Sequence, residues 1–221
     1  MPSARPAPRT RERDLVLAAR ALFDERGMQE APIEEIARTA GIARGLIYRS
    51  FSSKEELFVL TVTTYLDELD AILAEAISED ADPRVQLARC TDAYVRYCHR
   101  FPAFLDCSLS LMKRPARDLQ AIVSDSVWLR LGQHMARCID RVAAILRSGN
   151  DMGTWELPHP DYMANLLWTQ GLGVMHFARL GVGVRRLAPG VPEVFSVAAE
   201  DVIASCVASA QALVEVRPAP R

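Results

Sequence analysis

The stretch IEEIARTAGIARGLIYRS, residues 33–50, holds two short apolar-patterned segments on either side of one glycine. Pro32 precedes the first segment, Ile33 to Ala40, and its fixed φ suits the opening turn of a helix. Gly41 ends that helix, and the second segment, Ile42 to Ser50, begins at once. Two helices of this length and spacing are typical of a helix-turn-helix, whose second helix enters the DNA major groove.

Three positions in this stretch support the same packing. Ala37 is small where the two helices must touch, Gly41 lies where the turn favours positive φ, and Ile47 can insert between the helices. No proline interrupts residues 35–47. Helical pairs of this shape also occur in proteins that never bind DNA, so the spacing alone leaves both interpretations open.

Helical spacing continues on both sides of the stretch. An amphipathic pattern predicts a helix from about Arg11 to Arg26, closed by Gly27. Downstream, Ser52 and Ser53 precede two glutamates and predict the cap of a long fourth helix. The apolar stripe of that helix is Phe58, Val62, Tyr65, Leu66, Leu69, Ile72, Leu73 and Ala76.

Alternating strand patterns are hard to find in the remainder, so the expected fold class is all-α. Turn residues divide the remainder into about five further helices, one from about Leu119 to Leu146. The helix from Tyr162 to Leu180 is apolar nearly all round and must be covered on two sides. The final helix has one apolar stripe that starts at Phe195. Its second stripe consists of small residues that suit a two-fold dimer interface: Ala198, Ser205, Ser209 and Ala212.

Charge and composition narrow the class of protein. The 221 residues carry a net charge of only -2, yet the window from Ile36 to Lys54 holds four basic residues and no acidic one. A cationic N-terminal end favours contact with nucleic acid. We expect no membrane span, secretion signal or thiolate zinc site, because long apolar runs and CxxC pairs are missing. The expected compartment is the cytoplasm.

Residues 11–58 closely resemble the DNA-binding head of the TetR family of transcriptional regulators. The resemblance lies in LF-x-x-x-G, IA-x-x-AG and G-x-IY-x-x-F-x-SKEEL, which occur in that order. It implies a three-helix head over 11–56 and a helical effector-binding and dimerisation body over 57–216. A Pro/Arg-rich arm (1–10) and a tail (217–221) complete this division. It also implies a homodimer on a palindromic double-stranded DNA operator, and a small-molecule effector.

By matching positions, the resemblance places six residues at the DNA: Arg44, Gly45, Leu46, Tyr48, Arg49 and Lys54. Arginines can reach guanine edges or phosphates, and tyrosine can donate to phosphate. The chain departs from the family at two helix starts, where Pro32 and Ala43 replace the usual Ser or Thr. One or two phosphate hydrogen bonds are therefore expected to be missing, or replaced by the arm.

An effector pocket is expected where the helices of the body converge, and its apolar lining would suit a hydrophobic or aromatic effector. The candidate residues are Tyr97, Phe104, Leu109, Met112, Trp128, His134, Met135, Trp168, Gln170, Leu172, Met175 and His176. For any single one of them, plain core packing is the competing interpretation.

Three rival hypotheses are open. An enzyme is disfavoured, because the sequence contains no nucleophile elbow, phosphate loop or HExxH motif, and we expect no cofactor or metal. A thiol-responsive regulator on the same fold would use Cys90, Cys98 or Cys107 with another partner. A helical interaction module without DNA binding is suggested by Pro32 and Ala43.

Overall fold

The computed structural model describes residues 8–27, 32–78 and 81–215, and within them helices dominate. The predicted arm lies outside these residues up to position 7, as does the tail 217–221. The chain forms two compact units. The first combines residues 1–67 with 102–135, and the second combines 68–101 with 136–221. Each unit therefore contains two separate stretches of the chain. The predicted division between head and body at 56/57 is a different one, which concerns function, and it stays a prediction.

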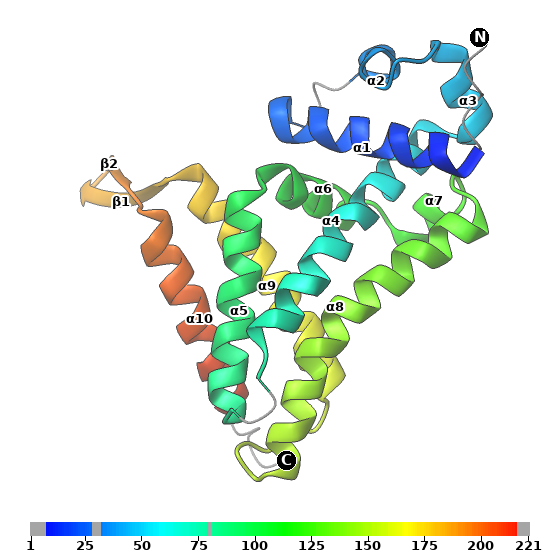
Figure 1. The fold of residues 1–221 in the computed structure, drawn as a ribbon. Helices are drawn as coiled ribbons and strands as arrows, with labels where there is room; N and C mark the ends of the chain where they lie inside the picture. The colour runs from blue at the N-terminus through cyan, green and yellow to red at the C-terminus, as the bar shows by residue number, and fades with distance from the viewer. Residues whose placement is uncertain (1–7, 28–31, 79–80, 216–221) are drawn as a thin grey trace. The chain divides into compact units, whose positions relative to one another are not determined.

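The first unit is entirely helical in its described part (Figure 1). Its complete helices are α1 (Pro8–Arg26), α2 (Ile33–Thr39), the 3-10 helix η2 (Arg44–Leu46), α3 (Ile47–Ser50), α6 (Pro102–Met112) and α7 (Ala116–Gln120). It also includes the first part of α4 (Lys54–Ala76) and of α8 (Asp125–Asp151). Helix α1 packs against α2, α3 and α6.

The core of the head forms as the sequence predicts. Ile47 is buried, as is Ala37, whose carbonyl accepts a hydrogen bond from the Ile42 amide at 2.9 Å. Gly41 has φ of +68° and Gly27 has φ of +84°, so both glycines end their helices in the left-handed region. These contacts confirm the helix-turn-helix packing.

At the start of helix α4, Glu56 takes part in several hydrogen bonds with neighbouring serines. The Glu56 amide donates to Ser53 Oγ at 3.1 Å, as the predicted cap requires. The carboxylate of Glu56, itself only 6% exposed, accepts from the Ser52 amide at 2.7 Å and from the amide and hydroxyl of Ser124. Desolvation opposes ionisation, but the Ser124 and Ser52 hydrogen bonds outweigh it and lower the pKa of Glu56.

Glu56→Gln is expected to destabilise the protein by about 1–3 kcal/mol at pH 7, because the ionised acceptor of three part-buried hydrogen bonds is lost. A carboxyl with a lowered pKa stabilises the fold above its unfolded pKa of about 4.3, and this contribution disappears as the pH falls through the folded pKa. Urea unfolding at pH 7 and at about pH 3.5 measures the effect. The deficit should shrink at the lower pH, and Glu55→Gln, a half-buried neighbour 3.9 Å from Arg114 Nη1, should show little at either pH. A deficit independent of pH would contradict this role for the Glu56 charge.

The second unit contains α5 (Pro83–Arg100), α9 (Pro160–Leu180), α10 (Ala199–Glu215) and the remainders of α4 and α8. Helices α5, α9 and α10 pack against one another (Figure 1). Tyr94 of α5 stacks on Trp168 of α9 with ring centroids 4.7 Å apart. The Tyr94 hydroxyl donates to the Trp168 carbonyl at 3.0 Å. Gly171 makes this approach possible, since a Cβ there would lie 2.5 Å from the Tyr94 ring.

Two predicted helices have wrong boundaries. Residues between α9 and α10 form an antiparallel hairpin of β1 (Val182–Ala188) and β2 (Val191–Ser196), so Phe195 lies in a strand instead of the last helix. Gly190, with φ of +77°, makes the turn, and the β-branched residues around it favour extended backbone. The helix expected over 119–146 is interrupted after α7, because the Ser124 amide and hydroxyl bond to Glu56. The all-α class holds with this one hairpin added.

Candidate DNA-binding site and ligand cavities

The segment η2–α3 presents polar side chains outward on an anchored backbone. Ile47 and Phe51 are buried and fix the segment to the head. Arg44, Tyr48 and Arg49 are exposed on the opposite side. Gly45 is exposed, Leu46 is half-buried, and Lys54 is exposed at the start of α4. All six predicted DNA-contact residues therefore occur in one short stretch, and five of them are exposed.

The Arg44 guanidinium is held in place before any DNA contact. It lies 2.8 Å from Glu34 Oε1, and both side chains are more than half exposed. A hydrogen bond with Tyr48 and the charge of Glu34 raise the pKa of Arg44, so this side chain stays cationic. An exposed ion pair of this kind contributes little to stability, so a phosphate can replace Glu34 at small cost.

The two departures at the helix starts have structural counterparts. Pro32 stands before α2 and Ala43 before η2, and neither supplies a side-chain hydrogen bond to its helix. The second helix is also shorter than expected, because Ala43 is extended (φ -70°, ψ 140°) and the helix starts at Arg44. Neither Pro32 nor Ala43 therefore offers a side-chain hydrogen bond to a phosphate, and the polar side chains of this segment begin at Arg44.

The predicted effector-pocket residues are divided between the two units. Phe104, Leu109, Met112, Trp128, His134 and Met135 lie in the first unit, and Tyr97, Trp168, Gln170, Leu172, Met175 and His176 lie in the second.

In the first unit, Phe104 packs on Tyr65, and His134 Nδ1 lies 2.8 Å from Asp67 Oδ1. Met112 is exposed, as is His176 in the second unit. Tyr97, Leu172 and Met175 are buried in the second unit. Of the whole set, only Trp168 and Gln170 line one of the cavities described below.

Among the hollows in the described part of the chain, three bear on ligand binding. A small enclosed cavity of about 20 Å³ in the second unit is lined by Trp168, Gln170, Tyr94 and apolar neighbours, and is large enough for one water. Gln170 Oε1 is buried there without a hydrogen-bond partner. A hollow of about 310 Å³ in the first unit is bordered by Phe23, Phe58 and residues of α6.

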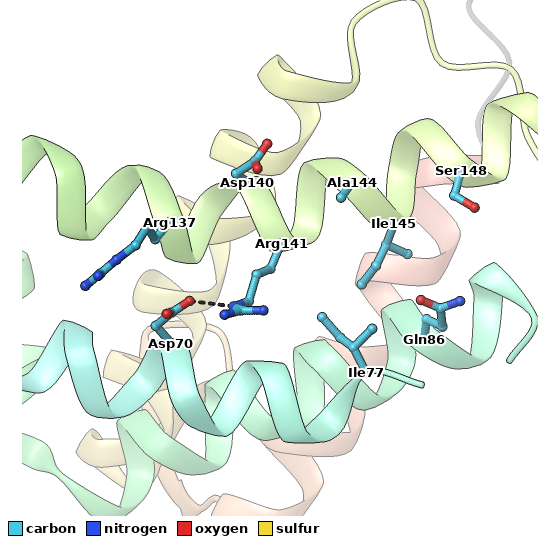
Figure 2. A pocket seen from close by; sticks show the side chains of 9 residues that line it. All are labelled: Asp70, Ile77, Gln86, Arg137, Asp140, Arg141, Ala144, Ile145 and Ser148. Atoms are coloured by element: carbon cyan, nitrogen blue, oxygen red, sulfur yellow. Dashed lines mark hydrogen bonds and ion pairs between the residues drawn. The ribbon is translucent and has the colours of Figure 1, made fainter. Parts of the chain in front are cut away.

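The largest of the three hollows, of about 570 Å³, is lined by α4, α5 and α8 in the second unit (Figure 2). This hollow was not predicted from the sequence. Arg137 and Arg141 are spaced as residues on the solvent-facing side of a helix are, so the sequence gives no sign that they border a hollow. The contact between Arg141 and Asp70, which comes from a different helix, is visible only in the structure.

The cysteines give the thiol-responsive hypothesis no support. All five are described, all are buried, and none forms a disulfide. Burial raises the pKa of the Cys90 thiol to about 12 and raises the pKa values of Cys98 and Cys107 as well. A reactive cysteine needs a thiolate and access to solvent, and these residues have neither. The described residues also contain no cluster of acids, histidines and cysteines that suits a metal ion.

Comparison with known proteins agrees with the geometry of the head. Residues 15–60 match the family model described as bacterial regulatory proteins, tetR family. The transcriptional activator FasR of Mycolicibacterium smegmatis is 33% identical over 84 residues, which are 38% of each chain. The transcriptional repressor KstR2 of Mycobacterium tuberculosis is 35% identical over 78 residues, which are 35% of this chain and 39% of that one. The matches thus span about two fifths of these relatives.

Solved structures extend the likeness to the fold of the whole chain. RolR, solved in complex with resorcinol, superposes with a TM-score of 0.69 at 16% identity, covering 95% of this chain and 90% of that one. PfmR of Thermus thermophilus superposes with a TM-score of 0.60 at 21% identity, covering 90% and 97%.

The exposed η2–α3 segment on a packed three-helix head defines a helix-turn-helix DNA-binding domain. Residues 15–60 therefore match the tetR family in sequence, and the chain shares the fold of the solved structures of RolR and PfmR. Within the described residues, no helix is both long enough and apolar enough to cross a bilayer.

Proposed function

We propose that this protein is a cytoplasmic, dimeric repressor that binds a palindromic operator and is released by a small hydrophobic or aromatic effector. The observation that carries the proposal is the outward presentation of Arg44, Tyr48 and Arg49 on the head. A dimer seated on an operator blocks polymerase sterically, which favours repression, although the relatives include the activator FasR. In this proposal the protein is not an enzyme.

Dimerisation through α9 and α10 is supported by what these helices leave exposed. Tyr162, Leu166 and Phe177 of α9 are apolar and exposed, although a helix of this composition should be covered on both sides. On α10 the small residues Ser205 and Ala212 are exposed too, and small side chains allow close helix approach. Two copies related by a two-fold axis would cover both surfaces.

An aromatic effector is supported by two observations. RolR, a structural neighbour, was solved with resorcinol. In this chain, the buried Gln170 Oε1 beside Trp168 has no donor in the structure, and a ligand hydroxyl would supply one. The enclosed cavity is too small for a ring, so entry would require Tyr94 and Trp168 to separate. Release of DNA would follow if the ligand favours a state whose heads no longer fit the operator.

Two solution measurements test the DNA-binding and dimer proposals. Analytical ultracentrifugation should give a dimer for the parent, and Ser205→Arg, which places a charge in the proposed interface, should give a monomer with unchanged helicity. Affinity for a duplex should fall steeply as salt rises, because cationic contacts release counterions. A monomeric parent would contradict the dimer. Lack of DNA binding even at low salt would favour the interaction module.

A further inference from the structure

The hollow of about 570 Å³ in the second unit has the size of a small-molecule site. It is bordered by Asp70 of α4, by Ile77 directly after the end of α4, by Gln86 of α5, and by one side of α8. The α8 residues are Arg137, Asp140, Arg141, Ala144, Ile145 and Ser148, which recur at spacings of three and four. None of these nine residues belongs to the predicted effector pocket.

The lining changes in character from one end to the other (Figure 2). Charged groups occupy one end, where Arg137 and Arg141 lie one helical turn apart and Asp70 faces Arg141. Ile77 and Ile145 form an apolar middle. A charged end followed by an apolar middle fits an elongated ligand with one charged end and a short apolar body.

The sign of that charge follows from how the acids are already paired. Asp140 accepts from Arg147 Nη2 at 2.6 Å, and Asp70 accepts from Arg141 Nε at 2.5 Å. The Asp70 bond uses one of the five N–H groups of Arg141, whose side chain is about one-third exposed. Because both acids have cationic partners, the group best able to gain a further charged partner is the Arg141 guanidinium, which can bind a carboxylate through two parallel hydrogen bonds.

The far end of the hollow offers a hydrogen-bond acceptor. Gln86 is 8% exposed, and its Nε2 donates to the Ala81 carbonyl at 2.7 Å, which fixes the orientation of the amide. Figure 2 shows the Gln86 oxygen on the side of the amide that is nearer to Ile77. The Ser148 hydroxyl has only a weak contact with Met152 sulfur at 3.9 Å. A ligand hydroxyl placed here would donate to Gln86 Oε1.

We propose that this hollow is a second ligand site, which binds a small organic carboxylate with a short apolar or aromatic body and a hydroxyl at its far end. The carboxylate lies on Arg141 and competes there with Asp70. Binding at this site is separate from the proposed Trp168 cavity, and it requires neither DNA nor the arginines of the head.

Isothermal titration calorimetry on the full-length protein at pH 7 tests the site. The probes are benzoate, 4-hydroxybenzoate and hexanoate, each paired with its neutral amide of nearly the same shape. The carboxylates should bind at least tenfold tighter than the amides, and 4-hydroxybenzoate should bind tighter than benzoate. Arg141→Gln should weaken carboxylate binding at least tenfold. The matched control is Arg130→Gln, which changes an arginine of the same helix that pairs with Glu12 outside the hollow, and it should leave binding unchanged.

Asp70→Asn is a second variant that keeps the side-chain shape and removes the competing charge. It should tighten carboxylate binding about three- to tenfold, an effect that general damage to the fold would not produce. Equal affinity for acids and amides, no binding of any of the three acids up to 20 mM (about -2.3 kcal/mol), or weaker binding by Asp70→Asn would overturn the proposal. DNA affinity of Arg141→Gln without ligand should match the parent, so failure of this site and failure of the DNA-binding proposal are distinguishable.

Discussion

Replacing both Arg44 and Arg49 with alanine is expected to lower affinity for the specific operator at least a hundredfold. Both side chains are exposed on the segment that Ile47 and Phe51 anchor in the head. An arginine that reads a guanine edge contributes about 1–3 kcal/mol of discrimination, and each 1.4 kcal/mol corresponds to a factor of ten. Since neither side chain is part of the core, the fold and the dimer should be unaffected.

Fluorescence anisotropy on the duplex that the parent protein prefers measures this loss. The matched control is Arg117→Ala with Arg186→Ala, which removes two exposed arginines and changes the net charge equally. The control should bind within about threefold of the parent, a difference of roughly 0.7 kcal/mol. Operator binding by the Arg44/Arg49 variant at parental affinity would show that the contact residues are assigned wrongly.

Gly149→Ala is expected to have the largest effect on stability. Gly149 lies in the last turns of α8, and a Cβ there would lie 2.1 Å from Trp155 Cε2. The Trp155 side chain is 7% exposed, and its Nε1 donates to the Leu146 carbonyl at 2.8 Å. A methyl group would displace the indole, break this hydrogen bond and open space in the core. The expected cost is about 3 kcal/mol, or a fall in Tm of roughly 6–12 °C.

Gly132→Ala is the control for this substitution because Gly132 lies in the same helix and a Cβ there would meet nothing within 4 Å. Alanine in an exposed helix should be neutral or should stabilise by up to about 1 kcal/mol. Differential scanning calorimetry of both variants makes the comparison. Equal Tm values would contradict the proposed packing of Trp155 against Gly149.

The head was predictable because its determinants are local. Gly41 has positive φ and Ile47 is buried between neighbouring helices. Both residue types are recognisable within the eighteen residues of the helix-turn-helix stretch. The hairpin was missed although Pro189 and Gly190 separate two runs rich in β-branched residues, because the strands are short and lack a clean alternation.

Cavities depend on contacts between distant segments, which spacing along one helix does not reveal. Arg141 and Asp70 are 71 positions apart and meet only in the folded chain. The helical pattern of α8 placed Arg141 among solvent-facing residues, and the structure places it at the edge of a hollow. Conversely, Leu172 and Met175 are apolar residues of the kind that lines a pocket, but in the structure they are buried in the core. Apolar side chains that line space and those that fill it look alike in sequence.

Selection of bound sequences from a random duplex library, with the parent protein and the Arg44/Arg49 double alanine variant side by side, tests the central claim most directly. A dimer that inserts one η2–α3 segment in each of two successive major grooves should enrich a palindrome with half-sites about 10 base pairs apart. The parent should recover this palindrome and the variant should not. Lack of any enriched sequence with the parent, or the same palindrome from both proteins, would contradict the account.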